Sequence, residues 1–378
     1  MAIRYPAAFI RGGTSKAIVF QVGDLPLDRN DWDAIFLRAM GSPDRYGRQL
    51  NGMGGGISSL SKVCIVGSSS VPDADVDYTF AQVQIQDAKV DYSGNCGNMS
   101  SAIGPYAIDQ GLLPAPSGEE ACVRIHNTNT HKIIHATFPI RHGKSVEEGD
   151  LSIPGVDGTG APVRLDFLTP GGASTRKLLP SGAVTDVLDV PGIGAFTVSL
   201  IDAANACVFV DAAALGLSGT ESPEDLGAQH EILQILGELR LRGSVAMGIA
   251  SSLEAAASIR MIPFVALVTS ARESQTFDRE VIPADNVDLV VRMLSNGQPH
   301  KALPLTGALC TAVAMQMEGS IPNQLARKNR DSRALRLGMP SGVLIVAADV
   351  GRSPDGWHAK SGSFFRTTRR LFDGHVYA

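Results

Sequence analysis

The sequence predicts an α+β fold made of two similar domains. The chain has 378 residues, which is more than one hydrophobic core usually organises, so two domains are expected. Short apolar runs bounded by turn residues predict strands over much of the chain. Two segments rich in small apolar residues instead show helical spacing, one in each half. Strands and buried helices are therefore expected in a repeated arrangement.

The first half alternates predicted strands with glycine-rich turns. Strands are expected at 17–20 and 63–66, each after a cluster of glycine and hydroxyl residues, and at 78–85, where apolar and polar residues mostly alternate. A helix is expected after Asn98, ending near Gly111, because apolar residues recur there at spacings of three and four. Further strands are expected at 123–126, 132–138 and 163–167.

The second half repeats the order of these signals. Residues 201–209 resemble 10–20, since each segment passes from an isoleucine through a turn into the strand pattern Ala-x-Val-Phe. Thr306 and Gly307 open a second helix of small apolar residues. Both helices end in the pattern Gly-x-x-Pro, at 111–114 and 319–322. These parallels predict a duplicated domain.

Turn signals at 185–194 mark the expected boundary between the two domains, which we place at 1–188 and 189–364. Residues 224–242 are expected to form a surface helix, with Ser222 as its N-cap. Residues 285–295 are expected to form another. Both helices are assigned to the scaffold.

The composition excludes several classes of protein. The net charge is −5, so the basic excess of a nucleic-acid-binding protein is absent. No apolar run is long enough to cross a bilayer, and the N-terminus lacks the apolar core of a secretion signal. The five cysteines form no CxxC pair, and the eight histidines show no metal-ligand spacing. We therefore expect a cytoplasmic protein without a metal or other cofactor.

Cys96 has the sharpest local signal for chemistry. It lies in Ser93–Asn98 (SGNCGN), where the first predicted helix begins. A helix N-terminus presents unpaired N–H groups and a partial positive charge, which favour a thiolate and can hold a carboxylate. Free cysteines usually pack as small apolar side chains, so a buried spacer between turn-forming glycines is the alternative interpretation.

A glycine-rich run leads to Lys62. Residues 51–62 read NGMGGGISSLSK, and glycine N–H groups, hydroxyls and a lysine all suit carboxylates. The Walker pattern is not matched, so a nucleotide site is disfavoured. RGGTSK at 11–16, His300-Lys301 and Ser341-Gly342 have the same character. Each could be an ordinary solvated turn, but their number favours a small polyanionic substrate.

RGGTSK, NGMGGGISSLSK and SGNCGN, in this order, resemble the motifs of the PrpF family. Weaker similarity at 202–217, 298–308 and 339–342 extends the resemblance over nearly the whole chain. The family includes 2-methylaconitate cis-trans isomerase, methylitaconate and aconitate Δ-isomerases and 4-oxalomesaconate tautomerase. The resemblance implies a diaminopimelate epimerase-like fold, in which two pseudo-repeated domains each curl a sheet around a central apolar helix. A strand at about 365–378 is expected to return to the first domain.

The resemblance also implies which residues form the site, in a cleft between the domains. It assigns catalysis to Lys62 and Cys96. The residues expected to bind substrate are Arg11, Thr14, Ser15, Met53, Ser59, Ser93, Asn95, Gly97, Asn98, Asn205, Lys301, Thr306, Gly307, Ser341 and Gly342. Epimerases of this fold use one cysteine from each domain, whereas here Thr306 is matched to Cys96. This departure favours allylic proton transfer over racemisation.

The expected function is a cofactor-independent isomerase acting on a small unsaturated di- or tricarboxylate. One group would remove an allylic proton, and a proton would return at another carbon. Either Lys62 or Cys96 could act first. The alternatives are an epimerase or racemase of an amino or hydroxy acid, and a carboxylate-binding protein that has lost the chemistry. The substrate and the oligomeric state, a homodimer included, are left open.

Overall fold

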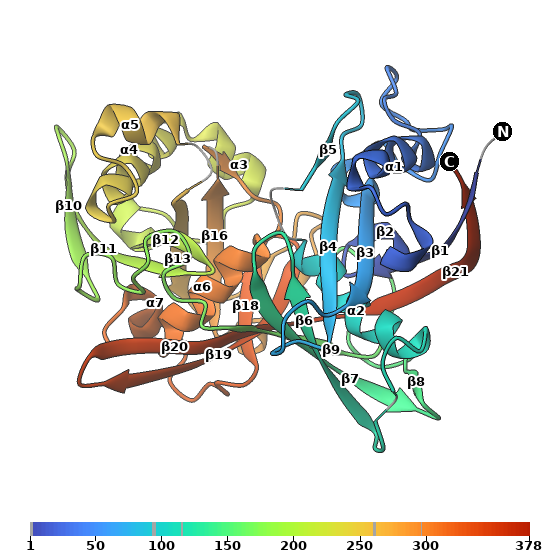
Figure 1. The fold of residues 1–378 in the computed structure, drawn as a ribbon. Coiled ribbons are helices and arrows are strands. Elements are labelled where there is room, and N and C mark those ends of the chain that lie inside the picture. Colours follow the sequence, from blue (N-terminus) through green and yellow to red (C-terminus); the bar gives the residue numbers. More distant parts are fainter. Residues whose placement is uncertain (1–2, 93–95, 115, 260–261, 296) are drawn as a thin grey trace. The chain divides into compact units, whose positions relative to one another are not determined.

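The computed structural model describes residues 3–92, 96–114, 116–259, 262–295 and 297–378. The chain forms two compact units: one comprises Met1–Asp166 with Phe365–Ala378, and the other comprises Phe167–Phe364 (Figure 1). Residues 167–188, which the sequence assigned to the first domain, belong to the second unit. Strand β10 (Asp186–Val190) begins within this stretch and pairs with the neighbouring strand of that unit, β11 (Gly194–Ala203).

The first unit is built on a mixed sheet. Its pairings run from β1 (Arg4–Gly12) antiparallel to β2 (Ser15–Gln21), β2 parallel to β3 (Lys62–Ser68), β3 antiparallel to β4 (Val76–Val83), β4 parallel to β6 (Glu120–Asn127), and β6 antiparallel to β7 (Lys132–Arg141). The C-terminal strand β21 (Thr368–Tyr377) pairs with β1. The shorter strands are β5 (Val90–Asp91), β8 (Lys144–Ser145) and β9 (Val163–Leu168).

The second unit repeats this order of pairings. They run from β11 antiparallel to β12 (Asn205–Asp211), β12 parallel to β13 (Phe264–Ser270), β13 antiparallel to β16 (Leu289–Ser295), β16 parallel to β18 (Leu335–Met339), and β18 antiparallel to β19 (Gly342–Ser353). Five consecutive pairings of the same sense confirm the predicted repeat. The remaining strands are β14 (Ser274–Gln275), β15 (Val281–Ile282), β17 (Gln298–Pro299) and β20 (Gly356–Arg366).

Each unit has one apolar helix at its centre. In α2 (Gly97–Asp109) every residue from Met99 to Ile108 is buried, and in α6 (Leu305–Gln316) every residue from Gly307 to Met315 is buried. Small residues are needed because the sheet approaches closely: a Cβ on Gly104 would meet the Phe138 ring at 2.7 Å. Both predicted helices, and the predicted curling of a sheet around each, are confirmed.

The other helices lie outside these centres. They are α1 (Trp32–Met40), α3 (Pro223–Ala228), α4 (His230–Ala246), α5 (Leu253–Ser258) and α7 (Ile321–Leu325), with 3₁₀ turns η1 (Val22–Asp24), η2 (Arg29–Asp31), η3 (Ser58–Leu60), η4 (Ala212–Leu215) and η5 (Ala284–Asn286). None of the helices in the described residues is long and apolar enough to cross a membrane.

Two predicted surface helices are corrected. The segment 224–242 forms α3 and α4 rather than one helix, because Gln229 at their junction leaves helical geometry (φ −89°, ψ 77°). The segment 285–295 is mostly strand β16. Its Arg292 does not lie on a surface face: it is 2% exposed and donates to the carbonyls of Thr220 and Glu221. A charged side chain can be buried in a sheet when backbone carbonyls accept hydrogen bonds from its N–H groups.

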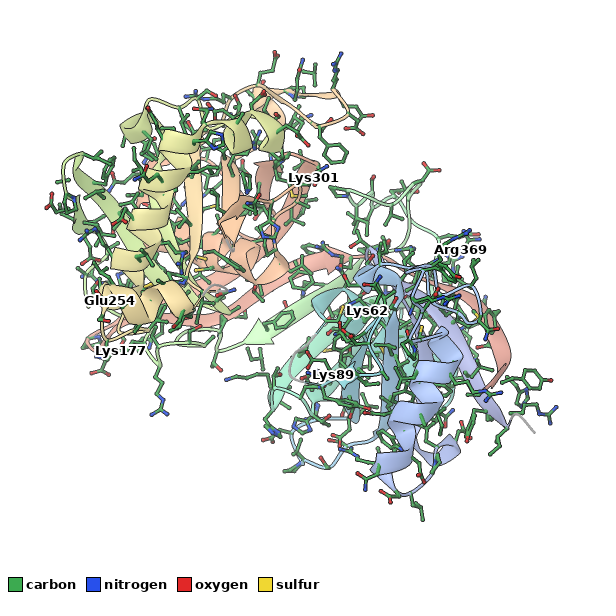
Figure 2. All side chains as sticks on the ribbon, turned by 90° about the horizontal axis from the view of Figure 1, so that it is seen from above. Lys62, Lys89, Lys177, Glu254, Lys301 and Arg369 are labelled. Carbon is green, nitrogen blue, oxygen red and sulfur yellow. The ribbon has the colours of Figure 1, made fainter. Side chains whose placement is uncertain are left out.

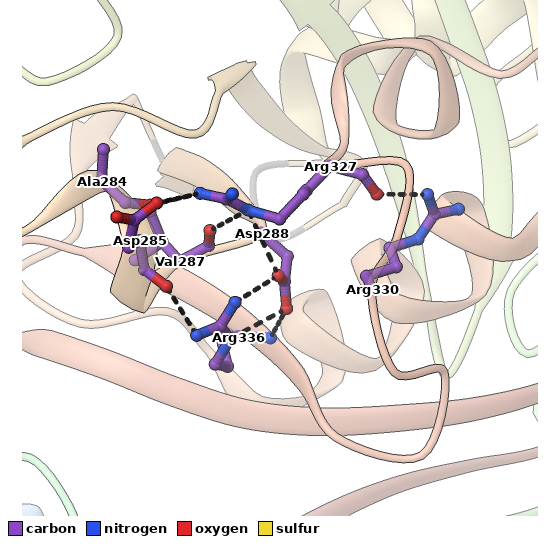
Figure 3. Close-up of polar contacts among 7 residues, drawn as sticks. All are labelled: Ala284, Asp285, Val287, Asp288, Arg327, Arg330 and Arg336. Carbon is purple, nitrogen blue, oxygen red and sulfur yellow. Dashed lines mark hydrogen bonds and ion pairs between the residues drawn. The ribbon is translucent and has the colours of Figure 1, made fainter.

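Asp288 organises a polar cluster at the start of β16 (Figure 3). Its side chain is 1% exposed, and its Oδ1 lies 2.7 Å from Nη2 of Arg336. The Arg336 backbone N–H and Nε both donate to Oδ2, at 2.9 and 3.2 Å. Arg327 adds a longer ion pair at 3.9 Å. The cluster fixes β16 against β18 and the loop after α7.

Candidate functional site

Lys62 is the first residue of β3 and is 7% exposed (Figure 2). The strand register places it between Ala17 on β2 and Gln82 on β4. Its Nζ donates to Gln82 Oε1 at 2.6 Å and lies 4.9 Å from the centre of the Phe80 ring. The lysines that form ion pairs within the described part of the chain are Lys301 and Lys360. Lys62 is therefore a buried amine whose near neighbours are neutral.

The glycine-rich run before Lys62 wraps around the buried side chain of Gln49. Oε1 of Gln49 accepts from the Gly56 N–H at 3.0 Å and from Ser61 Oγ at 2.6 Å. A Cβ on Gly54 would meet this Oε1 at 2.3 Å, so any larger residue there would have to displace the Gln49 side chain. Some of the glycines and hydroxyls of this run are thus needed for the structure of the loop itself. Of the predicted substrate residues in the run, Met53 and Ser59 are half-buried.

Cys96 is the N-cap residue of α2. Its backbone is extended (φ −107°, ψ 98°), and its side chain makes no capping hydrogen bond. The Cys96 carbonyl accepts from both the backbone N–H and Oγ of Ser100, at 3.0 and 3.1 Å. The thiol is partly exposed, as a reacting group must be. Gly97 begins the helix directly after it.

Cys64 follows Lys62 by two residues in β3. It is fully buried, and its Sγ lies 3.8 Å from Tyr78 Oη. Burial raises the pKa of the Cys64 thiol far above its usual value; the nearby charge of Cys96 raises it further, whereas that of Lys62 lowers it. Cys64 therefore stays a protonated thiol and is not a candidate for the base.

Asn98 joins the start of α2 to the β1–β2 hairpin. Its Nδ2 donates to Thr14 Oγ1 at 3.1 Å, and its Oδ1 accepts from Arg366 Nε at 2.9 Å. Gly13, in the hairpin turn, has φ +52°, and a Cβ there would meet Asn98 Oδ1 at 2.3 Å. Arg366 is 7% exposed, and burial lowers its pKa to about 10.

Arg11 stabilises the same β1–β2 hairpin through hydrogen bonds to backbone carbonyls. Its Nη1 donates to the carbonyls of Gly13 and Thr367, at 3.0 and 2.9 Å, and burial lowers its pKa. Ser15 is also buried, with 3% exposed. The structure thus brings together the predicted residues of the hairpin and of the α2 N-terminus. Ser93 and Asn95, which were also expected in the site, lie outside the described residues.

The second unit has an equivalent link at α6. Asn205, after the β11–β12 turn, donates from Nδ2 to Thr306 Oγ1 at 3.4 Å. In the described residues, Asn205 Oδ1 and Ser341 Oγ are buried with no hydrogen-bond partner. Gly307 lies in the first turn of α6, and Gly342 begins β19. Lys301 differs, because its exposed side chain forms an ion pair with Glu224 at 3.4 Å.

The model of the family described as PrpF protein matches residues 2–378. The chain belongs to the PrpF family. It is 41% identical to 3-methylitaconate isomerase of Eubacterium barkeri over 377 residues, 99% of this chain and 97% of the relative. It is 37% identical to 2-methyl-aconitate isomerase of Cupriavidus necator over 384 residues, 99% of this chain and 97% of the relative. With such relatives, the chain is an isomerase.

Solved structures agree with this assignment. The crystal structure of methylitaconate-delta-isomerase superposes with a TM-score of 0.92 at 40% identity, covering 100% of this chain and 96% of that one. A hydroxyproline epimerase superposes with a TM-score of 0.51 at 11% identity, covering 100% and 94%, which concerns the fold alone. The fold is that of the diaminopimelate epimerase-like proteins, as the sequence predicted.

Aligning the two units of this PrpF protein revises one sequence match. The N-cap residues of the central helices are Cys96 and Pro304, so Thr306 corresponds to Asn98 rather than to Cys96. The turn glycines after the helices, Gly111 and Gly319, keep the same offset of 208 and both have positive φ. The second unit therefore carries no thiol at the position of Cys96.

Two residues of this site were missed in the sequence. Gln82 and Arg366 contact Lys62 and Asn98, but they lie 20 and 268 residues away along the chain. No local motif marks either of them. Within the described residues, no group of three or more His, Cys, Asp or Glu side chains could hold a metal ion.

Proposed function

We propose that this PrpF-family isomerase moves a proton within a small unsaturated di- or tricarboxylate, without a cofactor. Candidate substrates are 2-methylaconitate, aconitate and 4-oxalomesaconate. The observation that carries the proposal is that one unit holds both a buried amine, Lys62, and a partly exposed thiol at a helix N-terminus, Cys96. The names of the relatives, which act on methylitaconate and methylaconitate, support the same substrate class.

The chemistry needs one proton to leave carbon and one to return. A base takes a proton from the allylic carbon beside the carbon–carbon double bond, and the electron pair spreads over the alkene and the adjoining carboxylate or carbonyl. An acid then protonates a different carbon, so the double bond moves and the formula is unchanged. Lys62 must be a neutral amine to take the first proton, and Cys96 must be a thiolate to do so. We assign the first step to Lys62.

The first turn of α2 suits the developing negative charge. Helix N-terminal N–H groups stabilise anions, and the neutral side chains of Asn98 and Thr14 lie beside this turn. We propose that Ser15, Met53, Ser59 and Gly97 complete the substrate contacts of the first unit. For the second unit we propose Asn205, Lys301, Thr306, Gly307, Ser341 and Gly342. Arg11 is assigned to holding the hairpin that presents Thr14.

An epimerase function is disfavoured by the second unit. A two-base epimerase of this fold needs an acid and a base on opposite faces of one carbon, and the second thiol would come from the other unit. Pro304 is at that position here and has no group able to carry a proton. The five free cysteines suit a reducing compartment, and we propose the cytoplasm.

The test is incubation of the enzyme with each candidate acid in deuterated water, followed by NMR. We expect deuterium uptake together with a changed double-bond position or geometry for at least one acid. Lys62→Met and Cys96→Ser should lower the rate by about 10²–10⁴-fold, as loss of an acid or base does. The matched controls are the exposed residues Lys89→Met and Cys122→Ser, which should retain full activity. Full turnover by Lys62→Met or Cys96→Ser would refute the assignment.

A further inference from the structure

We propose that Gln82 is the positioning residue that sets the protonation of Lys62. The two side chains face each other across β3 and β4, since Lys62 and Gln82 are direct partners in the antiparallel register. Their contact, Lys62 Nζ to Gln82 Oε1, is 2.6 Å long. This inference rests on the proposed function, because it concerns the amine that we assign as the base.

The Gln82 amide can face Lys62 in only one orientation. Its Nε2 donates to the carbonyls of Ser58 and Ser61, at 3.1 and 2.9 Å. Carbonyl oxygens only accept hydrogen bonds, so the NH₂ end of the amide must point toward these two residues. Oε1 is then left facing Lys62. The lysine therefore meets an acceptor that carries no net charge.

The loop that holds Gln82 is itself fixed by a second buried amide. Ser61 Oγ donates to Oε1 of Gln49, and Gln49 Nε2 donates to Ser42 Oγ at 2.8 Å. Gln49 is 0% exposed and has φ +54°, a backbone conformation that needs support from its surroundings. The path from Gln49 through Ser61 to Gln82 connects the glycine-rich motif to the orientation of Lys62.

A neutral acceptor is what a lysine base requires. An amide oxygen can accept an N–H from either the ammonium or the neutral amine, so the amine can lose its proton and keep its position. A neutral amine that donates to Gln82 has a lone pair available for a second partner. A carboxylate at the same distance would instead hold the ammonium form, because opposite charges stabilise each other strongly in a buried place.

The test compares Gln82→Glu with Gln82→Met in the full-length protein. The measured quantity is the pH midpoint at which the Lys62 amine reacts with an acylating reagent, read by peptide mass spectrometry. Only the neutral amine reacts. In Gln82→Glu the midpoint should rise by about one pH unit or more, as an added opposite charge within hydrogen-bond distance requires. In Gln82→Met the ammonium loses its acceptor, and the midpoint should fall.

Because the labelling midpoint should move in opposite directions in the two variants, the effect of charge can be distinguished from a disturbance of the loop. Both variants lose the two hydrogen bonds to Ser58 and Ser61, so a loop disturbance alone would shift both midpoints the same way. Gln86→Glu adds the same charge at an exposed position and should leave the midpoint unchanged. In the exchange assay, the acidic limb of kcat/KM should follow the labelling midpoint in each variant.

The outcomes separate the two proposals. Equal midpoints in Gln82→Glu, Gln82→Met and the unchanged protein would overturn the role of Gln82, whether or not a substrate has been found. Shifted midpoints with an unmoved pH profile of kcat/KM would also overturn it. If the unchanged protein exchanges no proton into any candidate acid, the proposed function fails, while the labelling experiment still decides whether Gln82 controls Lys62.

Discussion

The side-chain amide of Asn98 donates to Oγ1 of Thr14 at 3.1 Å, which ties the first turn of α2 to the β1–β2 hairpin. The second unit keeps this link with the residue types exchanged, since Asn205 of the hairpin donates to Thr306 of α6 at 3.4 Å. In both units an amide and a hydroxyl hold a helix N-terminus against a turn. The link is therefore a feature of the repeated domain.

Gly13→Ala should break the link in the first unit. The added Cβ would meet Asn98 Oδ1 at 2.3 Å, and alanine is strained at φ +52°. We expect a loss of stability of about 1–3 kcal/mol and a fall in isomerase activity, because the start of α2 must move away from the hairpin. Thermal unfolding and the exchange assay would measure the two effects.

Gly23→Ala is the matched control for this change. A Cβ on Gly23 would meet nothing within 4 Å, and its φ lies outside the left-handed region. The variant should unfold at the same temperature as the unchanged protein or slightly higher, since alanine restricts the unfolded chain. Equal stability of the Gly13 and Gly23 variants would show that the hairpin tolerates a side chain beside Asn98.

Alkylation should distinguish Cys96 from the buried cysteines. Cys64, Cys207 and Cys310 are 0% exposed, and burial raises the pKa of Cys64 and of Cys207, which keeps both thiols protonated. In the native protein we expect iodoacetamide to modify Cys96 and the exposed Cys122, and to spare the other three. Peptide mass spectrometry before and after unfolding would give the extent of modification at each site.

Inactivation should follow only one of the two accessible thiols. In a Cys122→Ser background, loss of activity should keep pace with modification of Cys96. In a Cys96→Ala background, modification of Cys122 should have no effect on the residual rate. Inactivation that followed Cys122 instead would remove Cys96 from the proposed chemistry.

The sequence could predict the repeat, the two central helices and the hairpin motifs, because these depend on local patterns. The strand β16 escaped prediction because burial of Arg292 depends on carbonyls about 70 residues away. Gln82 escaped for a similar reason, since a glutamine in an alternating strand has no distinctive local signal. Its role follows from the register that places it opposite Lys62. The surroundings of both residues therefore depend on contacts between segments far apart in the sequence, which a local sequence pattern does not contain.

The match of Thr306 to Cys96 shows a second limit of prediction from sequence, which is the exact alignment of the two repeats. Short motifs fixed the approximate position of α6, but only the helix boundaries gave the offset that pairs Cys96 with Pro304. The error was two residues. In a helix, that displacement turns a side chain by more than half a turn and so changes which residues face the same surroundings.

Asp288→Asn tests the buried polar cluster of the second unit. The substitution keeps the shape of the side chain but removes the charge that lies 2.7 Å from Arg336 and 3.9 Å from Arg327. Two guanidinium groups then lose their shared carboxylate in a place where Asp288 is 1% exposed. We expect a loss of stability of about 3 kcal/mol, at the low end for a broken buried pair because Arg336 is 36% exposed.

Asp285→Asn is the control for this change. The Asp285 carboxylate also pairs with Arg327, at 3.3 Å, but is 94% exposed, so its loss should cost less than about 0.5 kcal/mol of stability. Urea unfolding of the full-length protein would measure both variants, and equal costs would contradict burial as the source of the cluster's contribution.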